Sequence, residues 1–503
     1  MRKAKILATL GPASEKRETI VEMLRAGLNA VRINMSHGTR EEHAERIRVA
    51  RETAAELGIP LAVLVDLSGP KIRTRELQNG KGVTLEEGQL FTITNRDVEG
   101  THEIVGTNYD DLPSVVKPGS RVLLDDGAIE LNVESTTDTD VVTRCVTGGK
   151  LLERKGINLP NTPLPIPSLT RKDREDLEWA MGQNVDYIAL SFVRTAQDCI
   201  EVKDLIKKLN KRQLGRALLV AKIEKAEAIE NLDEIIQATD GGMVARGDLG
   251  VETSVELVPV YQKRIIEQAI AHDRFVITAT QMLQSMIEAP TPTRAEASDV
   301  ANAVWDGSDA VMLSAETASG KYPVESIKTM ARIIDSAEGL KSEYQSPIKL
   351  SLPPSGRTSQ ALCKAAANAA AEMETDKVAV FTESGLMARR LSSFRSGLQT
   401  FALTTSRDAR DQLALIWGVT PFFHELLEIG SDVQVLGDET NMDLLGDQED
   451  KTGELLQLGE TTLTDAGVVT RGETIIMMAG RLSGHGLSSS VVVWTIGEEI
   501  ARR

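Results

Sequence analysis

The stretch LLVAKIEKAEAIENLDEIIQATDGGMVARGDLG, residues 218–250, decides the fold class of this chain. Its first apolar run, Leu218–Lys222, predicts a strand, a helical stretch follows, and Gly242–Ala245 predicts the next strand. Two short apolar strands joined through a helix are typical of a βαβ unit with parallel strands. Charged residues follow both strands directly, which places them at one edge of the predicted sheet.

The same alternation extends in both directions from this unit. Eight apolar segments, each followed by a helical stretch, predict a closed (β/α)₈ TIM barrel, and an open doubly wound sheet is the alternative. The predicted strands are Lys5–Leu10, Ala30–Asn34, Leu61–Asp66, Asp186–Ser191, Leu218–Lys222, Gly242–Ala245, Phe275–Ala279 and Ala310–Leu313. Predicted helices include Lys16–Ala26, Arg40–Leu57 and Arg171–Gln183.

The alternation is interrupted once and ends well before the C-terminus. Residues 69–167 are rich in Val, Thr, Asp and Gly with dense turn signals, which predicts a small inserted β-barrel domain. The expected domains are residues 1–68 and 168–345 for the barrel, 69–167 for the inserted lid, and 346–503 for a C-terminal αβα domain.

The C-terminal domain shows its own pattern of helix and strand. A helix is predicted at Thr358–Met373 and a strand at Lys377–Thr382. The segment 425–450 is acidic and punctuated by glycine, so we expect a loop there.

Composition limits the classes of partner. The chain has 503 residues and a net charge of −17, which argues against nucleic acid or an anionic membrane because both need a basic face. Cys145, Cys199 and Cys363 are scattered, so neither a disulfide framework nor a zinc motif is indicated. No apolar run has the length of a membrane helix. We expect a cytoplasmic protein whose substrate is small.

Polar residues gather at the predicted carboxyl ends of the strands, where TIM barrels carry their functional groups. Lys222 and Glu224 project to one side if the strand continues through Glu224, and Asp248 follows the next strand. A structural ion-pair network is one interpretation. The other is Mg²⁺ held by the two carboxylates beside a lysine that stabilises a transferring phosphoryl group. Arg32 and Arg73 would add positive charge.

Other strand-end residues are ambiguous when each is taken alone. Gly247 would let a ligand approach the backbone, although a plain turn explains the glycine equally well. Thr280 and His37 are, singly, more typical of structural residues. Polar groups at seven strand ends together are nevertheless difficult to explain by packing.

Several segments resemble the pyruvate kinase family, in the family's order. They are Arg32–Gly38, Asp66–Arg73, Asp125–Gly127, Lys155–Pro160, Ala221–Glu227, Asp240–Glu252, and Thr278–Met282 through Thr317. The resemblance implies a TIM barrel with an inserted lid and an αβ domain. It also implies an allosteric homotetramer that transfers a phosphoryl group from phosphoenolpyruvate to ADP, giving pyruvate and ATP in glycolysis.

The resemblance also implies roles for individual residues. Catalytic roles fall on Lys222, Arg32, Thr280, Ser314 and Glu316, with the last two in the region that protonates the enolate. Substrate binding falls on Arg32, Lys222, Gly247, Asp248 and Thr280. Nucleotide binding falls on Asn34, His37, Arg73 and, from the lid, Lys155. Glu224 and Asp248 match the ligands of Mg²⁺, for which Mn²⁺ is an alternative.

One departure from the family pattern concerns a monovalent cation. Many members hold K⁺ near Asn34, Ser36 and Asp66, with Thr after that Asp and Glu five residues beyond it. Here Leu67 and Lys71 occupy those positions, which resembles the family's K⁺-independent branch. A lysine ammonium supplies the monovalent charge covalently. We therefore expect no requirement for K⁺.

Two segments of the C-terminal domain resemble the family's effector loops. One contains Thr382, Ser384 and Gly385, and the other contains Gly486 and Ser488. Hydroxyl and backbone N–H groups suit a phosphate, although two ordinary αβ turns explain the same residues. We expect allosteric control by a sugar phosphate or a nucleotide.

Two other functions fit parts of the pattern. A lyase or aldolase acting on pyruvate or phosphoenolpyruvate would share the barrel and the metal, but would need neither Arg73 nor Lys155. A non-catalytic relative would not need Lys222, Glu224 and Asp248 together with Thr280. Dependence on ADP separates the kinase from both.

Overall fold

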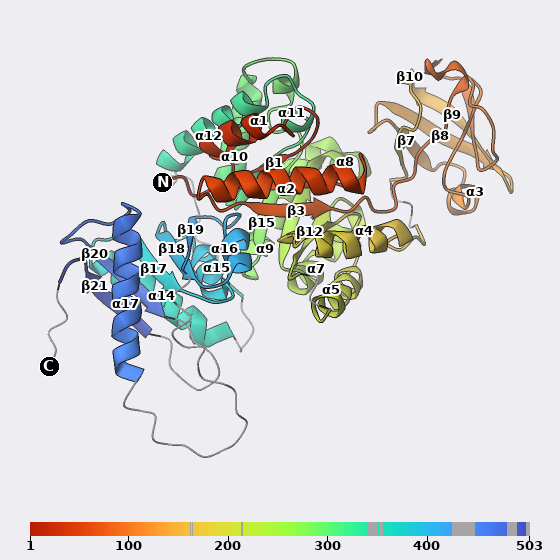
Figure 1. Cartoon of the computed structure of the whole chain (residues 1–503). Coiled ribbons are helices and arrows are strands. Elements are labelled where there is room, and N and C mark those ends of the chain that lie inside the picture. The colour runs from red at the N-terminus through yellow and green to blue at the C-terminus, as the bar shows by residue number, and fades with distance from the viewer. Residues whose placement is uncertain are drawn as a thin grey trace.

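Eight parallel strands close into a barrel in the order β1-β16-β15-β14-β13-β12-β3-β2, so the open sheet is excluded. The computed structural model describes residues 1–160, 162, 164–212, 215–340, 350–351, 356–424, 448–479 and 490–498. Figure 1 shows the barrel in the middle of the molecule, with the insertion on one side and the C-terminal domain on the other. The strands are β1 (Lys5–Thr9), β2 (Ala30–Asn34), β3 (Ala62–Asp66), β12 (Tyr187–Leu190), β13 (Leu218–Ile223), β14 (Gly241–Ala245), β15 (Phe275–Ala279) and β16 (Ala310–Leu313).

The barrel strands are mostly apolar because both of their faces are covered. Every residue of β1, β3, β14 and β15 is buried, which is typical of parallel strands flanked by helices. Several of the covering helices begin at capping boxes, among them those on Thr39, Thr170 and Thr293. The covering helices are α1 (Arg17–Arg25), α2 (Arg40–Glu56), α4 (Arg171–Gly182), α5 (Ala196–Asn210), α6 (Ala226–Glu230), α7 (Leu232–Ala238), α9 (Val258–Ala271), α10 (Arg294–Asp306) and α12 (Pro323–Gly339).

Short helical turns follow several strands on the carboxyl side of the barrel. They are α8 (Arg246–Glu252), η2 (Val255–Leu257), η3 (Gln284–Ile287) and α11 (Ala315–Ala318). Because α8 follows β14 without a loop, its first turn stands directly at the barrel mouth.

Four residues, here called the seam residues, join the strands in pairs at the opposite end. Each immediately precedes an even-numbered barrel strand. Each seam residue pairs with one residue of the preceding odd-numbered strand through two hydrogen bonds. The side-chain oxygen of the seam residue accepts from the backbone N–H of the strand residue, and the backbone N–H of the seam residue donates to the carbonyl of the same strand residue. The pairs and side-chain distances are Asn29 with Ile6 at 3.0 Å, Asp186 with Val63 at 2.7 Å, Asp240 with Leu219 at 2.9 Å, and Asp309 with Val276 at 2.9 Å.

The insertion follows β3 and is all-β apart from one short helix and one turn. Its strands form a six-stranded sheet, β11-β7-β8-β9-β5-β6, and a two-stranded sheet of β10 and β4. They surround their own apolar cluster, centred on residues such as Phe91 and Leu131. The elements are η1 (Gln78–Gly80), β4 (Val83–Leu85), β5 (Leu90–Thr94), β6 (Ile104–Gly106), α3 (Leu112–Val115), β7 (Arg121–Leu124), β8 (Ile129–Thr136), β9 (Asp140–Thr147), β10 (Gly149–Leu151) and β11 (Ile157–Asn158).

The C-terminal domain has a five-stranded sheet in the order β19-β18-β17-β20-β21, with β21 antiparallel to β20. The last residues of the acidic segment, 448–450, lie in helix α17. The loop prediction was wrong there, and residues 425–447 lie outside the described residues. The elements are α14 (Arg357–Glu372), β17 (Lys377–Phe381), α15 (Leu386–Ser393), β18 (Gln399–Thr404), α16 (Arg407–Leu413), β19 (Val419–Phe423), α17 (Gln448–Asp465), β20 (Thr474–Ala479) and β21 (Ser490–Thr495).

The end of the barrel that carries the seam residues packs against the C-terminal domain. The hydroxyl of Tyr187 donates to the carbonyl of Gln412 at 2.5 Å, and the Arg395 guanidinium lies 2.7 Å from Asp309. One apolar cluster runs from the barrel interior into this domain. The opposite end is therefore the one left open for a ligand. Among the described helices, none combines the length and apolarity needed to cross a membrane.

Candidate active site

Lys222 and Glu224 lie side by side at the carboxyl end of β13. The strand ends at Ile223, one residue before the end that the prediction assumed, and the two side chains nevertheless face each other. The ammonium of Lys222 lies 2.8 Å from Glu224 Oε1, and the carboxylate is fully buried. The backbone N–H of Phe192 donates to Glu224 Oε2 at 2.7 Å. The lysine is thus held by the neighbouring carboxylate at the mouth of the barrel.

Asp66 holds two cations of the site at once. Its Oδ1 lies 3.3 Å from the Lys222 ammonium, and its Oδ2 accepts from Arg32 Nε at 2.7 Å. Lys222 also donates to the hydroxyl of Ser191 at 2.7 Å, and Arg32 donates to the hydroxyl of Thr9 at 3.1 Å. Five neighbouring strand ends therefore fix the two cations in one place.

The carboxylates keep the Lys222 ammonium charged in spite of burial. Burial alone would lower the pKa of Lys222, but the charges of Asp66 and Glu224 outweigh it and raise that pKa. Burial opposes ionisation of Asp66, and the nearby Lys222 and Arg32 nevertheless hold its pKa below the usual range. The pKa of Glu224 is raised, mainly by burial, with Asp248 contributing in the same direction. A cation placed between Glu224 and Asp248 would relieve that repulsion.

The predicted metal site has only two protein ligands, the carboxylates of Glu224 and Asp248. Asp248, on the first turn of α8, is about a quarter exposed, whereas Glu224 is buried. Glu224 Oε1 is buried without a hydrogen bond of good geometry, although it faces the Lys222 ammonium. No group of three or more His, Cys, Asp or Glu side chains suited to a metal occurs within the described residues. Two carboxylates fit Mg²⁺, which keeps waters and substrate oxygens as its other ligands.

Thr280 and Gly247 contact each other beside Asp248. Thr280 has φ of 68°, a left-handed conformation that is strained for a β-branched residue. The N–H of Gly247 donates to Thr280 Oγ1 at 2.9 Å. The Arg246 guanidinium donates to the Thr280 carbonyl at 2.6 Å and pairs with Asp299 at 2.7 Å. Arg246 therefore holds the strained residue in place, a role that was not predicted from the sequence.

Ser314 and Glu316 form the beginning of α11. Glu316 is fully buried and accepts hydrogen bonds from the N–H groups of Ser314, at 2.7 Å, and Leu283, at 3.1 Å. The Ser314 hydroxyl is buried and has no hydrogen-bond partner among the described residues. The Glu316 carboxylate thus holds the two loops together through these hydrogen bonds. The Ser314 hydroxyl is free to bind a ligand.

The predicted nucleotide residues lie on both the barrel and the insertion. The pKa of His37 is lowered by burial and then by the charges of Arg73, Lys71 and Arg32, which places four basic residues near one another. Lys155 lies 2.9 Å from Asp125 within the insertion.

The positions predicted for a monovalent cation are already engaged. Asn34 Oδ1 accepts from the N–H of Ser36 at 3.1 Å, and both Asp66 oxygens face cationic side chains. Leu67 is buried and offers no side-chain ligand. Lys71 approaches Asp248 Oδ1, at 3.8 Å.

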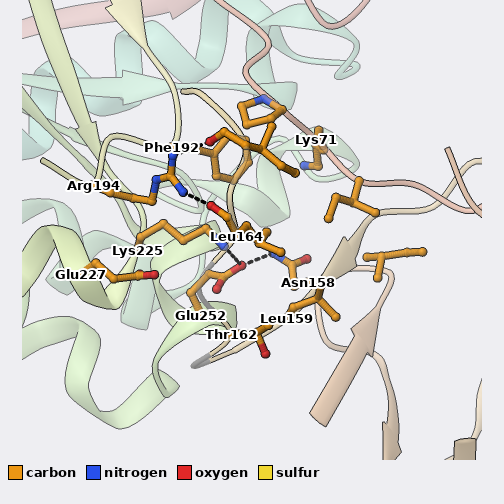
Figure 2. Close-up of a pocket in the computed structure, with 14 residues that line it drawn as sticks. Lys71, Asn158, Leu159, Thr162, Leu164, Phe192, Arg194, Lys225, Glu227 and Glu252 are labelled. Carbon is orange, nitrogen blue, oxygen red and sulfur yellow. Dashed lines mark hydrogen bonds and ion pairs between the residues drawn. The ribbon is translucent and has the colours of Figure 1, made fainter. Parts of the chain in front are cut away.

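A pocket lies between the insertion and the barrel, next to the segments that carry the predicted metal ligands (Figure 2). Sequence reasoning assigned no role to three polar residues of its lining, Asn158, Lys225 and Glu252. The spacing of Glu252 four residues after Asp248 could have suggested a shared helix face. The lining residues are Pro70, Lys71, Ile72, Ile157, Asn158, Leu159, Thr162, Leu164, Ile166, Phe192, Arg194, Lys225, Glu227 and Glu252.

The first predicted effector loop connects β17 to α15. Gly385 has φ of 74°, and its N–H donates to Thr382 Oγ1 at 3.1 Å. The carbonyl of Ser384 accepts from the Arg389 guanidinium at 3.2 Å. Gly486 and Ser488, predicted for the second loop, lie outside the described residues.

Comparisons with known proteins point to one family along the whole chain. The family model for the pyruvate kinase barrel domain matches residues 1–327, and that for the pyruvate kinase alpha/beta domain matches residues 360–493. Pyruvate kinase of Staphylococcus haemolyticus is 39% identical over 511 residues, covering 100% of this chain and 82% of the relative. That of Sporosarcina psychrophila is 40% identical over 509 residues with the same shares. The crystal structure of a pyruvate kinase from Cryptosporidium parvum has a TM-score of 0.84 at 30% identity, covering 98% of this chain and 96% of that one.

Proposed function

The chain belongs to the pyruvate kinase family, and we propose that Lys222, Glu224 and Asp248 carry its reaction at the open end of the barrel. The reaction is transfer of the phosphoryl group of phosphoenolpyruvate to ADP, which gives pyruvate and ATP. The observation that supports this site best is the Lys222 ammonium, held 2.8 Å from Glu224 and 3.3 Å from Asp66. Phosphoryl transfer depends on fixed positive charge of this kind.

Glu224 and Asp248 would hold the divalent metal, which we propose to be Mg²⁺ or alternatively Mn²⁺. The ion supplies positive charge to the phosphoryl oxygens and orients the substrate. Glu224 is immobilised by the N–H of Phe192, and Asp248 by its place on the first turn of α8. The two carboxylates therefore need little rearrangement to bind it.

Lys222 and Arg32 would bind the phosphoryl group, since Asp66 holds both cations at the same point. The N–H groups at the start of α8 and the Thr280 hydroxyl would bind the substrate carboxylate, with Gly247 leaving room beside Thr280 Oγ1. Asn34, His37 and Arg73, together with Lys155 from the insertion, would bind the nucleotide. Closure of the insertion over the site would exclude water from the reaction.

Protonation of the enolate needs a group at the barrel mouth that can deliver a proton. We assign this to the region of Ser314 and Glu316. The buried, unpaired hydroxyl of Ser314 supports its direct participation, and Glu316 would act by fixing the loop that carries it.

We propose that the enzyme works without K⁺, because Lys71 adds a permanent positive charge beside Asp248. We also propose an allosteric homotetramer with a cytoplasmic location. The side chains of Val255, Leu257 and Val260 are exposed on and after η2, and an interface between copies would cover such a patch. Size-exclusion chromatography with light scattering tests the tetramer. The loop of Thr382, Ser384 and Gly385 is the candidate effector site.

ADP-dependent release of pyruvate from phosphoenolpyruvate tests the function as a whole. Lactate dehydrogenase coupling would follow pyruvate with and without ADP in the presence of Mg²⁺. A lyase would consume its substrate without ADP, and a non-catalytic relative would release nothing. Formation of ATP in equal amount to pyruvate is the result expected of the kinase.

A further inference from the structure

One carboxylate, that of Glu252, joins three parts of the chain in the pocket of Figure 2. Its Oε1 accepts a hydrogen bond from Asn158 Nδ2 at 2.8 Å and lies 2.8 Å from the ammonium of Lys225. Asn158 belongs to β11 of the insertion, and Glu252 is the last residue of α8. All three side chains are buried. A buried carboxylate depends on such partners, because an unpaired charge in this position is costly.

The two barrel residues of this contact, Lys225 and Glu252, lie close in sequence to the proposed metal ligands. Lys225 is the residue after Glu224, and Glu252 lies one helical turn after Asp248 on the same face of α8. The Lys225 ammonium also lies 5.8 Å from the centre of the Phe192 ring, and the N–H of Phe192 binds Glu224. The Glu252–Lys225 ion pair therefore fixes the separation between the two segments that carry the ligands.

The insertion contacts α8 at further points around this ion pair. Lys71, in the connection that enters the insertion, lies 3.8 Å from Asp248 Oδ1. A Cβ built on Gly127, in the turn before β8, would lie 3.9 Å from both methyl groups of Val251. The insertion thus rests on the same helix that presents Asp248, and Asn158 contributes its buried hydrogen bond.

We propose that Glu252 is a positioning residue that couples the seating of the insertion to the affinity of the divalent metal. This rests on the proposed role of Glu224 and Asp248 as ligands. When Asn158 leaves Glu252, the carboxylate loses a donor and becomes hydrated, and the end of α8 is no longer held against Lys225. Asp248 then loses its fixed distance from Glu224. By linkage, metal binding favours the seated insertion to the same extent.

Binding of Mn²⁺ alone tests the coupling without turnover. Full-length wild-type enzyme and the variants Asn158→Ala and Glu252→Gln are titrated with Mn²⁺. Electron paramagnetic resonance measures the concentration of free Mn²⁺, which gives the Kd of each protein. Partners just outside the ligand shell typically change metal affinity tenfold or more, so each variant should raise the Mn²⁺ Kd about tenfold. Asn132→Ala, which removes an exposed amide from the same domain, should bind like the wild type.

A double-mutant cycle separates coupling from a general loss of structure. If Asn158 acts through Glu252, the double variant should bind Mn²⁺ no more weakly than the weaker single variant. Asn158→Asp places a second carboxylate against Glu252 and should weaken Mn²⁺ binding more than alanine does. Hydrogen exchange adds a structural measurement, since Mn²⁺ should slow exchange at Ile157 and Asn158 in the wild type and much less in Glu252→Gln.

The proposal is overturned if folded Asn158→Ala and Asn158→Asp both bind Mn²⁺ with the wild-type Kd. It is also overturned if the two single variants simply add, because Asn158 would then act independently of Glu252. A wild-type enzyme that neither binds Mn²⁺ nor releases pyruvate with ADP would instead refute the proposed function.

Discussion

The ammonium of Lys71 lies 3.8 Å from Asp248 Oδ1, although the whole insertion and several barrel strands separate the two residues in sequence. A lysine therefore enters the site from the first connection to the insertion and stands beside a proposed metal ligand. Both are only partly exposed, so water screens their attraction incompletely. We expect a permanent charge at this point to replace the monovalent cation.

Replacement of K⁺ by Na⁺ or tetramethylammonium should leave kcat within about twofold of its value in K⁺, because the Lys71 charge remains. Lys71→Glu, which introduces the residue of the K⁺-requiring members, should be nearly inactive without K⁺ and regain activity when K⁺ is added. Steady-state rates at constant ionic strength provide the measurement. A wild-type rate that collapses by orders of magnitude in tetramethylammonium contradicts K⁺ independence.

Lys222→Met should lower kcat by about 10³-fold, since it removes a fixed charge that acts on the transferring phosphoryl group. The fold should survive, which far-UV circular dichroism can verify. Lys207→Met provides the matched control, because Lys207 is exposed on α5 and pairs with Asp204 rather than with a residue of the site. Near-normal turnover of Lys222→Met would mean that the ion pair with Glu224 is structural.

A sugar phosphate or AMP should shift the half-saturating concentration of phosphoenolpyruvate by about fivefold or more, as coupled sites commonly do. Ser384→Glu should abolish the shift, because a carboxylate in this loop repels phosphate. Saturation curves with AMP and several sugar phosphates measure the effect. A wild-type curve that no tested compound moves argues against an effector site.

Lys5 predicts a dependence of stability on pH. Burial lowers the pKa of this lysine from 10.5 to about 7, and the charge of Arg2 acts in the same direction. Between these two values the unfolded chain binds more protons than the folded chain, so stability rises with pH, by at most about 1.4 kcal/mol per pH unit. The Tm of the wild type relative to Lys5→Met should therefore increase from about pH 7 to about pH 9.

Lys16→Met serves as the comparison for Lys5, since Lys16 is exposed. Its Tm difference from the wild type should be the same at both pH values. A Lys5→Met difference that is equally flat would show that Lys5 does not change its protonation on folding.

Strand positions were predicted well because the barrel strands are short runs of mostly apolar residues. The second, seventh and eighth predicted strands have the bounds that the structure shows. The fourth is shorter at both ends, where Asp186 is a seam residue and Ser191 accepts a hydrogen bond from Lys222. Side-chain hydrogen bonds removed both residues from the strand, and an apolar pattern contains no information about them.

Only those contacts of the site that form within one short segment of sequence could be predicted. The proximity of Lys222 and Glu224 follows from the two-residue period of a strand, and the structure shows it. The junction of Glu252 with Lys225 and Asn158 depends on how the insertion is seated against α8. Three separate segments meet there, so no single stretch of sequence could predict the contact. The sharing of Asp66 between Arg32 and Lys222 has the same origin.

The seam residues divide the barrel into modules of two strands. Asn29, Asp186, Asp240 and Asp309 each lock an odd-numbered strand to the even-numbered strand that follows it, and the adjacent pairs lack this link among the described contacts. A circularly permuted chain opened between two modules would retain all the locks within continuous sequence. A chain opened inside a module would have to form one of them between its two distant ends, and we expect it to fold more slowly.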